Sequence, residues 1–368
     1  MKRINRVQLF TGMLLLMAAR PSMAHQEQTE NDTAEYRFTI EKSVPFTPVK
    51  NQNRTGTCWS FATTSFIESE LIRTGKGEMD LSEMYFVRKS YELKADKYVR
   101  MHGTVNFAQG GLAWDVMHIW KESGMVPEEA YKGNAMGDSL PVHGEMDAVL
   151  RGYVDQVIRN RNGVLTPVWK EGFQGVLDAY LGRVPESFSV EGVTETPRTF
   201  ADHTGLNPDD YVAIGSYTHH PFYEQFILEI PDNWHWGAIY NLPLDEMMHT
   251  LEHALEQGYS VCWDGDVGEK GYDWKQGVAT HPSPVTQQSR QNGFNNYSTT
   301  DDHLEHIIGL ARDQHGERFY LVKNSWGTRE HIYQGTHYVS ESYMQAKTIF
   351  LMIHRDALPD SVREHLAL

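Results

Sequence analysis

The stretch 52–62 constrains this chain most, because it places one of only two cysteines directly before a helical pattern. From Trp59 onward the apolar residues recur with helical spacing, and Gly75 is suited to closing that helix. A Gly-Thr turn presents Cys58 at the first helical turn, where unpaired backbone N–H groups and the helix dipole stabilise an anion. A thiol placed there loses its proton more easily, and the thiolate is the nucleophile.

A cysteine at a helix start is not by itself a catalytic signal, since free cysteines are among the most buried residues. A cysteine nucleophile also needs a base, a group that orients the base, and donors for an oxyanion. The chain offers all three: Gln52 carries an amide six residues before Cys58, His303 opens an apolar run, and Asn324 begins an Asn-Ser-Trp-Gly segment. These residue types in this order predict nucleophilic catalysis on an acyl group.

The motifs Gln-x5-Cys-Trp-Ser-Phe-Ala, a late His and Asn-Ser-Trp-Gly together resemble the active-site set of papain-like cysteine peptidases. The resemblance implies that Cys58 is the nucleophile, His303 the base, Asn324 the residue that orients the imidazole, and Gln52 an oxyanion donor. His306 is the alternative base, but its spacing from Gly309 does not match the family strand. The resemblance further implies a set of substrate-binding residues: Gly110, Gly111, Trp59 and Trp326.

The middle of the chain resembles one branch of that family, the bleomycin hydrolase and aminopeptidase C group, through the stretch 258–267. Two departures from the papain pattern stand out. Thr55 replaces a cysteine that papain-like enzymes use in a disulfide, and 245 residues separate Cys58 from His303. The long separation implies an added segment between the two halves of the site. The expected fold is therefore α+β and papain-like, with a helical left half, a β-barrel-like right half and a mainly helical insertion.

The first residues are typical of a secretory signal peptide. A positive start is followed by an apolar run, Leu9–Ala19, that is too short to span a bilayer, and Ser22-Met23-Ala24 predicts a cleavage site. We therefore expect an exported protein, periplasmic or secreted. The predicted organisation is signal peptide 1–24, flexible lead-in 25–43, helical half with the nucleophile 44–135, insertion 136–235, strand-rich half with the histidine and asparagine 236–354, and short C-terminal helix 355–368.

Composition restricts the partners. The formal net charge is −16, which argues against nucleic acid and anionic membranes as binding partners. Two cysteines are too few for a disulfide framework, and Cys262 lies in an apolar run that predicts a buried structural thiol. Peptides are the expected substrates. The resemblance also implies a homo-oligomer, a hexamer in that branch.

No metal or cofactor is expected. His219 and His220 are adjacent, and neighbouring side chains are expected to point in different directions, which indicates a surface loop. His303 and His306 are three apart on a predicted strand, so their side chains should lie on opposite faces. Neither pair is accompanied by the spacing of a known metal motif.

The expected activity is that of a cysteine peptidase working through a thioester acyl-enzyme. The branch implies an aminopeptidase, in which the carboxylate of a C-terminal arm meets the substrate amine. Here Pro359 begins a predicted helix that continues to the last residues and spans only about 16 Å, so the arm is expected to be shortened. A papain-like endopeptidase is the alternative. A transglutaminase-like acyltransferase, an inactive peptide-binding protein and a metallohydrolase are less well supported by these residues.

Overall fold

Helix α1 (Cys58–Arg73) is the element on which both halves of the fold pack. All but the last two of its residues are buried, including its polar ones. One side of α1 packs against strands β10 (His303–Arg312) and β7 (Val261–Gly265), and the other against helices α2 (Glu83–Arg100) and α3 (Ala113–Ser123). The computed structural model describes residues 36–137 and 140–368, and residues 36–368 form one unit.

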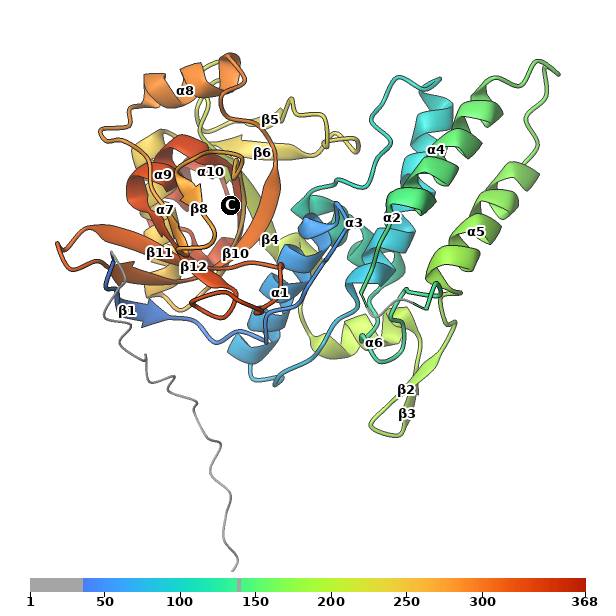
Figure 1. Ribbon diagram of the computed structural model, residues 1–368, viewed down its shortest axis with the longest axis horizontal. Helices are drawn as coiled ribbons and strands as arrows, with labels where there is room; N and C mark the ends of the chain where they lie inside the picture. Colours follow the sequence, from blue (N-terminus) through green and yellow to red (C-terminus); the bar gives the residue numbers. More distant parts are fainter. Residues whose placement is uncertain (1–35, 138–139) are drawn as a thin grey trace, which may run out of the picture. The chain divides into compact units, whose positions relative to one another are not determined.

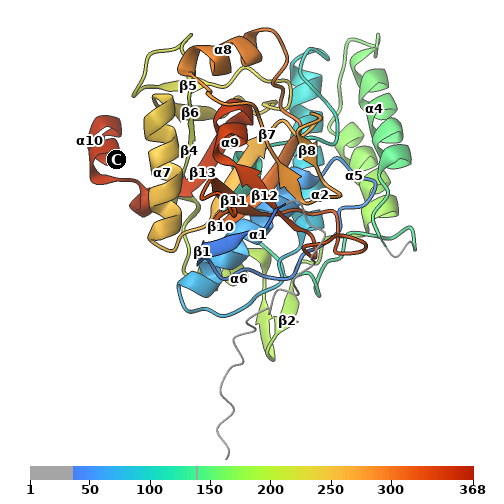
Figure 2. The ribbon, with the colours of Figure 1, turned by 60° about the vertical axis from the view of Figure 1, so that its left-hand side comes forward.

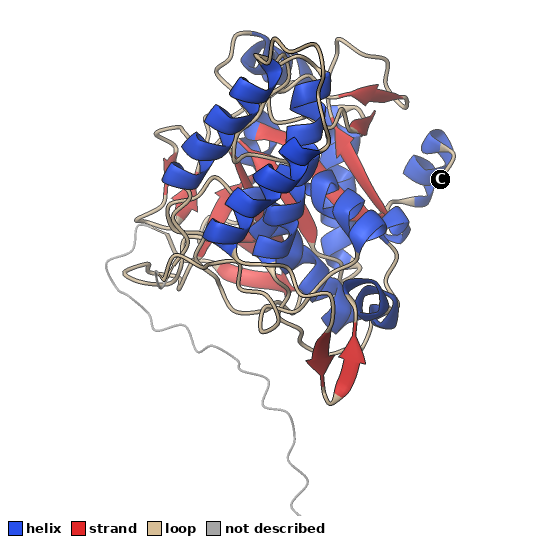
Figure 3. Ribbon diagram, turned by 90° about the vertical axis from the view of Figure 1, so that its right-hand side faces the viewer, coloured by secondary structure: helices blue, strands red, loops and turns tan. Residues whose placement is uncertain are grey.

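The helical half contains α2 and α3 together with α4 (Gly144–Ile158) and α5 (Val168–Leu181). Helix α2 packs against the other three, and Figure 3 shows this group of helices in front of the sheet. The Ser82 side chain caps α2 by accepting from the Tyr85 N–H, 3.1 Å away. The buried face of α4 contains Met146, Leu150 and Val154, whereas Val149 is 41% exposed and lies off this face.

The predicted insertion also contains smaller elements. A hairpin of β2 (Phe188–Val190) and β3 (Val193–Glu195) precedes α6 (Pro197–Thr204) and the short helix η1 (Pro208–Asp210). Side chains cap both of these helices: Thr196 accepts from the Thr199 N–H and Asn207 from the Asp209 N–H.

The strand-rich half is built on one sheet in the order β5-β6-β4-β13-β7-β10-β11-β12-β9-β8, with β1 paired to β10. Figure 1 shows this half on one side of the molecule and helices α2, α4 and α5 on the other. Strand β10 is buried along nearly its whole length, as expected for a strand covered on both faces. The other strands are β1 (Thr39–Ser43), β4 (Tyr211–Gly215), β5 (Gln225–Ile227), β6 (Ala238–Asn241), β8 (Tyr272–Asp273), β9 (Val278–Ala279), β11 (Arg318–Lys323), β12 (Thr336–Ser340) and β13 (Thr348–His354).

Two predicted boundaries need correction. Residues 39–43, predicted as part of a flexible lead-in, form β1 and pair with β10. The strand-rich half begins at β4, because β4 and β5 lie in the predicted insertion and join the main sheet. The predicted signal peptide 1–24 and the first part of the lead-in lie outside the described residues.

Helices also cover the sheet. Helix α7 (Leu244–Glu256) packs against β1, β7 and β10, while α8 (Gln287–Asn295) packs on α9 (Glu341–Lys347). After β13 the chain forms η2 (Arg355–Ala357) and α10 (Asp360–Leu366), which Figure 2 shows beside α7. The short C-terminal helix is thus confirmed. Within the part of the chain that the structure describes, no helix has the length and apolar character that crossing a membrane demands.

The pairing of three central strands sets the geometry of the site. Strands β10 and β11 form an antiparallel hairpin in which His306 lies opposite Lys323, so the start of β10 lies beside the end of β11. On the other side of β10, Leu304 lies opposite Asp264 of β7. Residues from three distant segments therefore meet where α1 begins.

Candidate active site

Cys58 is the first residue of α1, and its sulfur faces the start of β10. The Ser60 and Phe61 N–H groups both donate to the Thr57 carbonyl, at 3.0 and 3.3 Å, which closes the first turn and leaves the Cys58 N–H without an intrahelical acceptor. The residue is 9% exposed. Hydrogen bonding from the Leu304 backbone to the thiol shows that the N-terminus of α1 meets β10 at the sulfur.

The charge state of the thiol differs from the sequence expectation. Burial raises the pKa of Cys58, and the carboxyls of Asp264 and Asp301 raise it further, while hydrogen bonds from the Leu304 and Trp59 backbones act in the opposite direction. Burial therefore outweighs the helix N-terminus in this arrangement. Ionisation of Cys58 needs a base that takes the proton and keeps the resulting positive charge close to the sulfur.

His303 lies beside Asn324, as the motif spacing predicts. Its Nε2 is 2.9 Å from Asn324 Oδ1, and the Ser325 N–H donates to the same oxygen at 2.6 Å. Because this oxygen only accepts, Nε2 carries the hydrogen and Nδ1 is the atom left to accept a proton. The ring of Trp326 lies 4.7 Å from the His303 ring, between centroids, and partly covers it.

Gln52 is held with its amide in a defined orientation. Its Oε1 accepts from the Ser325 Oγ at 2.6 Å and its Nε2 donates to the Thr55 carbonyl at 2.8 Å. The backbone N–H of Gln52 donates to the Ser325 carbonyl, also at 2.8 Å. An amide nitrogen carries two hydrogens, so one stays available beside the Cys58 N–H for an oxyanion.

The glycines at 110 and 111 lie against other side chains of the site. A Cβ on Gly111 would lie 3.0 Å from the Trp59 ring, and one on Gly110 would lie 1.8 Å from Asp232. Trp59 is only 1% exposed and its Nε1 donates to the Gln109 carbonyl at 3.0 Å. Trp59 thus supports the glycine segment from below and is not placed to touch a substrate itself.

His306, the alternative base, faces away from Asn324. Its Nδ1 is 2.8 Å from the Ser65 Oγ of α1, and burial together with Lys323 holds the pKa of His306 well below its usual range. The two histidines of the His-x-x-His pattern thus lie in different surroundings, and His306 is placed as a neutral residue of the core.

Two residues behind Asn324 were not assigned a structural role by the sequence. The Asn324 Nδ2 donates to the Tyr272 hydroxyl at 3.1 Å, and this hydroxyl donates to Glu305 Oε1 at 2.9 Å. Glu305 is 1% exposed and its other oxygen is 3.5 Å from His337 Nε2. The signal that was available is a glutamate in the middle of an apolar strand, which in a buried position requires partners.

The proteins to which this chain is similar agree with this geometry. The family described as papain family cysteine protease matches residues 32–160 of the chain. The findings therefore support a papain-family cysteine protease domain in this chain, as the motifs predict. Aminopeptidase C of Lactococcus lactis subsp. cremoris is 22% identical to this peptidase over 362 residues, covering 85% of this chain and 82% of the relative.

A second relative and a solved structure extend the comparison. Aminopeptidase G of Lactobacillus delbrueckii subsp. lactis is 20% identical to this peptidase over 402 residues, covering 95% of this chain and 90% of the relative. The crystal structure of PepW from Lactobacillus rhamnosis HN001 matches with a TM-score of 0.71 at 17% identity, covering 89% of this chain and 84% of that chain. The papain-like α+β fold predicted from the motifs is thereby confirmed.

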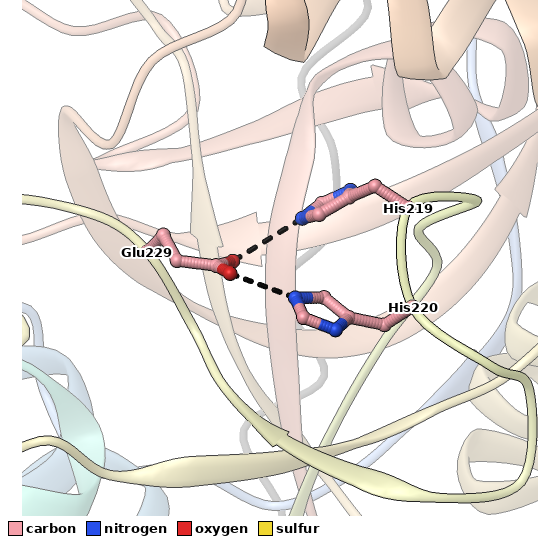
Figure 4. A group of neighbouring side chains, drawn as sticks. All are labelled: His219, His220 and Glu229. Atoms are coloured by element: carbon pink, nitrogen blue, oxygen red, sulfur yellow. Dashed lines mark hydrogen bonds and ion pairs between the residues drawn. The ribbon is translucent and has the colours of Figure 1, made fainter.

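One group of side chains in this peptidase has the composition of a metal site, and the expectation that His219 and His220 point in different directions was wrong. His219 and His220 both face Glu229: their Nε2 atoms lie 3.2 and 2.7 Å from its two oxygens (Figure 4). The three ligand atoms lie within 4.8 Å of one another. The histidines converge because His219 stacks on Phe294 and His220 stacks on Phe226.

The hydrogen bonds around this group oppose metal binding. The Thr218 N–H donates to Gln291 Oε1 at 2.6 Å, so Gln291 Nε2 is a donor toward His219 Nδ1, 3.0 Å away. Neutral His219 therefore carries its hydrogen on Nε2, the atom that a metal would need unprotonated. The arrangement satisfies Glu229 with two N–H donors and needs no ion.

Proposed function

We propose that this papain-like peptidase is a cysteine-type aminopeptidase, with Cys58 as nucleophile, His303 as base, Asn324 as the orienting residue and Gln52 as an oxyanion donor. The observation that carries the proposal is the 2.9 Å contact between His303 Nε2 and Asn324 Oδ1, because it directs Nδ1 to receive a proton. The four residues come from three segments of the chain, one with Gln52 and Cys58, one with His303 and one with Asn324.

The reaction follows from these positions. The Cys58 thiol passes its proton to His303 Nδ1, and the sulfur attacks the carbonyl carbon of the scissile peptide. The oxyanion accepts hydrogen bonds from the Cys58 N–H and from Gln52 Nε2. The imidazolium then protonates the leaving amine, the C–N bond breaks and a thioester remains. Water, deprotonated by His303, attacks the thioester and releases the acid product together with the free thiol.

The preference for aminopeptidase over endopeptidase activity has two supports. Relatives that share most of this chain's length are aminopeptidases C and G. The neighbourhood of Cys58 is also acidic, since Asp264 and Asp301 both act on the thiol. A free α-amino group is cationic at neutral pH, whereas the corresponding nitrogen of an internal residue is a neutral amide.

The test is an assay of residues 25–368 under reducing conditions, beside Cys58→Ala, on matched peptides with free and acetylated N-termini. An aminopeptidase releases single residues from the free peptide alone, and Cys58→Ala abolishes this release. Internal cleavage of both peptides would instead establish the endopeptidase. Release that survives in Cys58→Ala would overturn the assignment of the nucleophile.

Export and assembly belong to the same proposal. The positive start, apolar run and small-x-small site of residues 1–24 support export followed by cleavage near Ala24. Expression of the full chain, fractionation and N-terminal sequencing would test this, and an uncleaved cytosolic product would contradict it. Assembly as a hexamer rests on the family resemblance alone, and light scattering of the purified protein decides between a hexamer and a monomer.

A further inference from the structure

An unusual carboxyl pair lies beside the sulfur. Asp264 occupies the middle of the apolar strand β7 and is fully buried, at 0% exposure. Apart from the carboxyl of Asp301, neither of its oxygens has a hydrogen-bond partner among the described residues. The carboxyl of Asp301 is within hydrogen-bonding contact, so the two acids share a proton. A buried carboxylate without donors is costly, and its persistence calls for a ligand that supplies them.

The position of the pair relative to the nucleophile is set by the strands. Asp264 lies opposite Leu304, whose backbone hydrogen-bonds the Cys58 thiol. Asp301 lies two residues before His303, at the entry to the same strand. Burial is the largest cause of the raised pKa of the Cys58 thiol, and both carboxyls raise this pKa further. The strand register thus places Asp264 beside the backbone segment that contacts the sulfur.

A third carboxyl connects the pair to the glycine segment. Asp232 lies against the backbone of Gly110, and its Oδ1 accepts from Asn106 Nδ2 at 2.7 Å. The negative charge of Asp232 raises the pKa of both Asp264 and Asp301. Asp232 and Asp301 are partly exposed, whereas Asp264 is buried. A ligand would therefore reach the three carboxyls from the side of Asp232 and Asp301.

The chemistry of an aminopeptidase substrate fits this place. In its first residue the α-nitrogen and the scissile carbonyl carbon are bonded to the same Cα, so they lie only about 2.5 Å apart. Whatever binds the α-ammonium group must therefore lie beside the nucleophile. An ammonium group brings three N–H donors and one positive charge. These are the two things that the carboxyl pair lacks.

We propose that Asp264 and Asp301, assisted by Asp232, bind the free α-ammonium group of the substrate and so restrict this peptidase to N-terminal residues. The proposal rests on the aminopeptidase function above and names the residues that would produce it. The ammonium N–H groups donate to Asp301 and Asp264, and the shared proton of the pair leaves to water as the cation arrives. An acylated nitrogen carries no charge and would leave the buried carboxylate without compensation.

The burial of Asp264 and Asp301 agrees with this exchange of a proton for the substrate ammonium group. Desolvation and mutual repulsion raise the pKa of both carboxyls, so the empty pair holds a proton near neutral pH. A bound cation favours the ionised form of both acids. The cluster thus changes from a protonated resting state to a charged state only when an amine is present.

The experiment compares wild type with Asp264→Asn, Asp301→Asn and the exposed control Asp245→Asn on an aminoacyl p-nitroanilide. Each protein is normalised by titrating Cys58 with iodoacetamide, a neutral reagent without an amine. We expect both pair variants to lose about 10- to 100-fold in kcat/KM, mainly through KM, because charge-assisted hydrogen bonds are lost. Asp245→Asn should match wild type.

A second measurement separates binding from chemistry. Amino acid amides should slow alkylation of Cys58 in wild type and in Asp245→Asn, whereas N-acetylated amides should not. In the two pair variants the protection by free amides should disappear, while the alkylation rate without ligand stays equal or rises. Unchanged KM and unchanged protection in both pair variants would overturn the role of the pair while leaving the aminopeptidase in place. A wild type that releases no N-terminal residue would overturn the function itself.

Discussion

At the scale of single residues, Tyr272 is the group most worth removing, because its hydroxyl joins Asn324 to the buried Glu305. Tyr272→Phe keeps the ring but leaves the Asn324 amide free to rotate. We expect kcat to fall about tenfold with KM nearly unchanged, since orientation of the base acts in the chemical step. The pH profile of Cys58 alkylation should also shift.

That shift is the measurement that distinguishes a positioning role from a purely structural one, because loss of packing alone would lower stability and leave the profile in place. Tyr297→Phe is the matched control, since Tyr297 is 82% exposed. Wild-type kcat and an unmoved profile in Tyr272→Phe would show that the Asn324–Tyr272 hydrogen bond is dispensable.

Gln52 offers a second residue-scale prediction. Gln52→Ala removes one of two proposed oxyanion donors, and such a loss typically lowers kcat by about 10²- to 10³-fold. Steady-state kinetics should show this fall in kcat with a small effect on KM. Alkylation of Cys58 forms no oxyanion, so its rate should stay within about twofold of wild type, and an equal loss in both assays would point to a disturbed fold.

The sequence predicted the placement of His303 beside Asn324, because motif order and hairpin pairing determine both. It did not predict the setting of Asp264. The surroundings of that carboxyl depend on which strand pairs with β10, and strand neighbours distant in the chain cannot be read from local pattern. The same limit applies to His219 and His220, whose convergence on Glu229 depends on stacking against two distant phenylalanines.

At the scale of elements, the contact between β1 and β10 can be tested at Gly309. A Cβ there would lie 2.4 Å from the Lys42 carbonyl oxygen, which is backbone and cannot rotate away. Gly309→Ala should therefore push β1 from β10 and lower the free energy of unfolding by about 1–3 kcal/mol. Urea denaturation measures this change.

Gly175→Ala is the control for that variant. Gly175 lies within helix α5, and a Cβ there would meet no heavy atom within 4 Å. Alanine is favoured over glycine in a helix interior by about 1 kcal/mol, so this variant should be equally or more stable. A Gly309→Ala protein as stable as Gly175→Ala would mean that β1 does not need close contact at that point.

Elements with a strong local signal were predicted well, and those defined by pairing were not. The helix that begins at Cys58 carries apolar periodicity, and the short helix after Pro359 carries a proline at its start. Strand β1 has a polar, mostly exposed sequence, and only its ladder with β10 makes it a strand. The start of the strand-rich half was misplaced for the same reason, since β4 joins the sheet through β13.

At the scale of the whole molecule, buried titratable groups set the pH dependence of stability. Burial raises the pKa of Glu128 to about 8, far above the value near 4 of an unfolded carboxyl. The folded chain therefore holds a proton that the unfolded chain has lost, and stability falls as pH rises toward 8. Histidines with lowered pKa act oppositely, but only below about pH 6.5: His118, His143, His235, His306, His331 and His354.

These opposing effects predict maximum stability near pH 6.5 and a decline between pH 7 and pH 8. Glu128→Gln keeps the shape of the side chain without a titrating proton, so its melting temperature should decline less than that of wild type across this window. Differential scanning calorimetry at pH 6.5, 7 and 8 measures the difference. Parallel curves for the two proteins would mean that Glu128 is ionised in the folded state.

The proposed nucleophile Cys58 opens α1 and the proposed base His303 opens β10, so a long stretch of chain separates the two residues in the sequence. During synthesis the cysteine emerges early, but it has no proton acceptor until the hairpin of the second half has formed and docked. A nascent or half-folded copy is therefore expected to be inactive toward the unfolded chains around it. The order in which the polypeptide is made thus delays peptidase activity until both halves of the fold are complete.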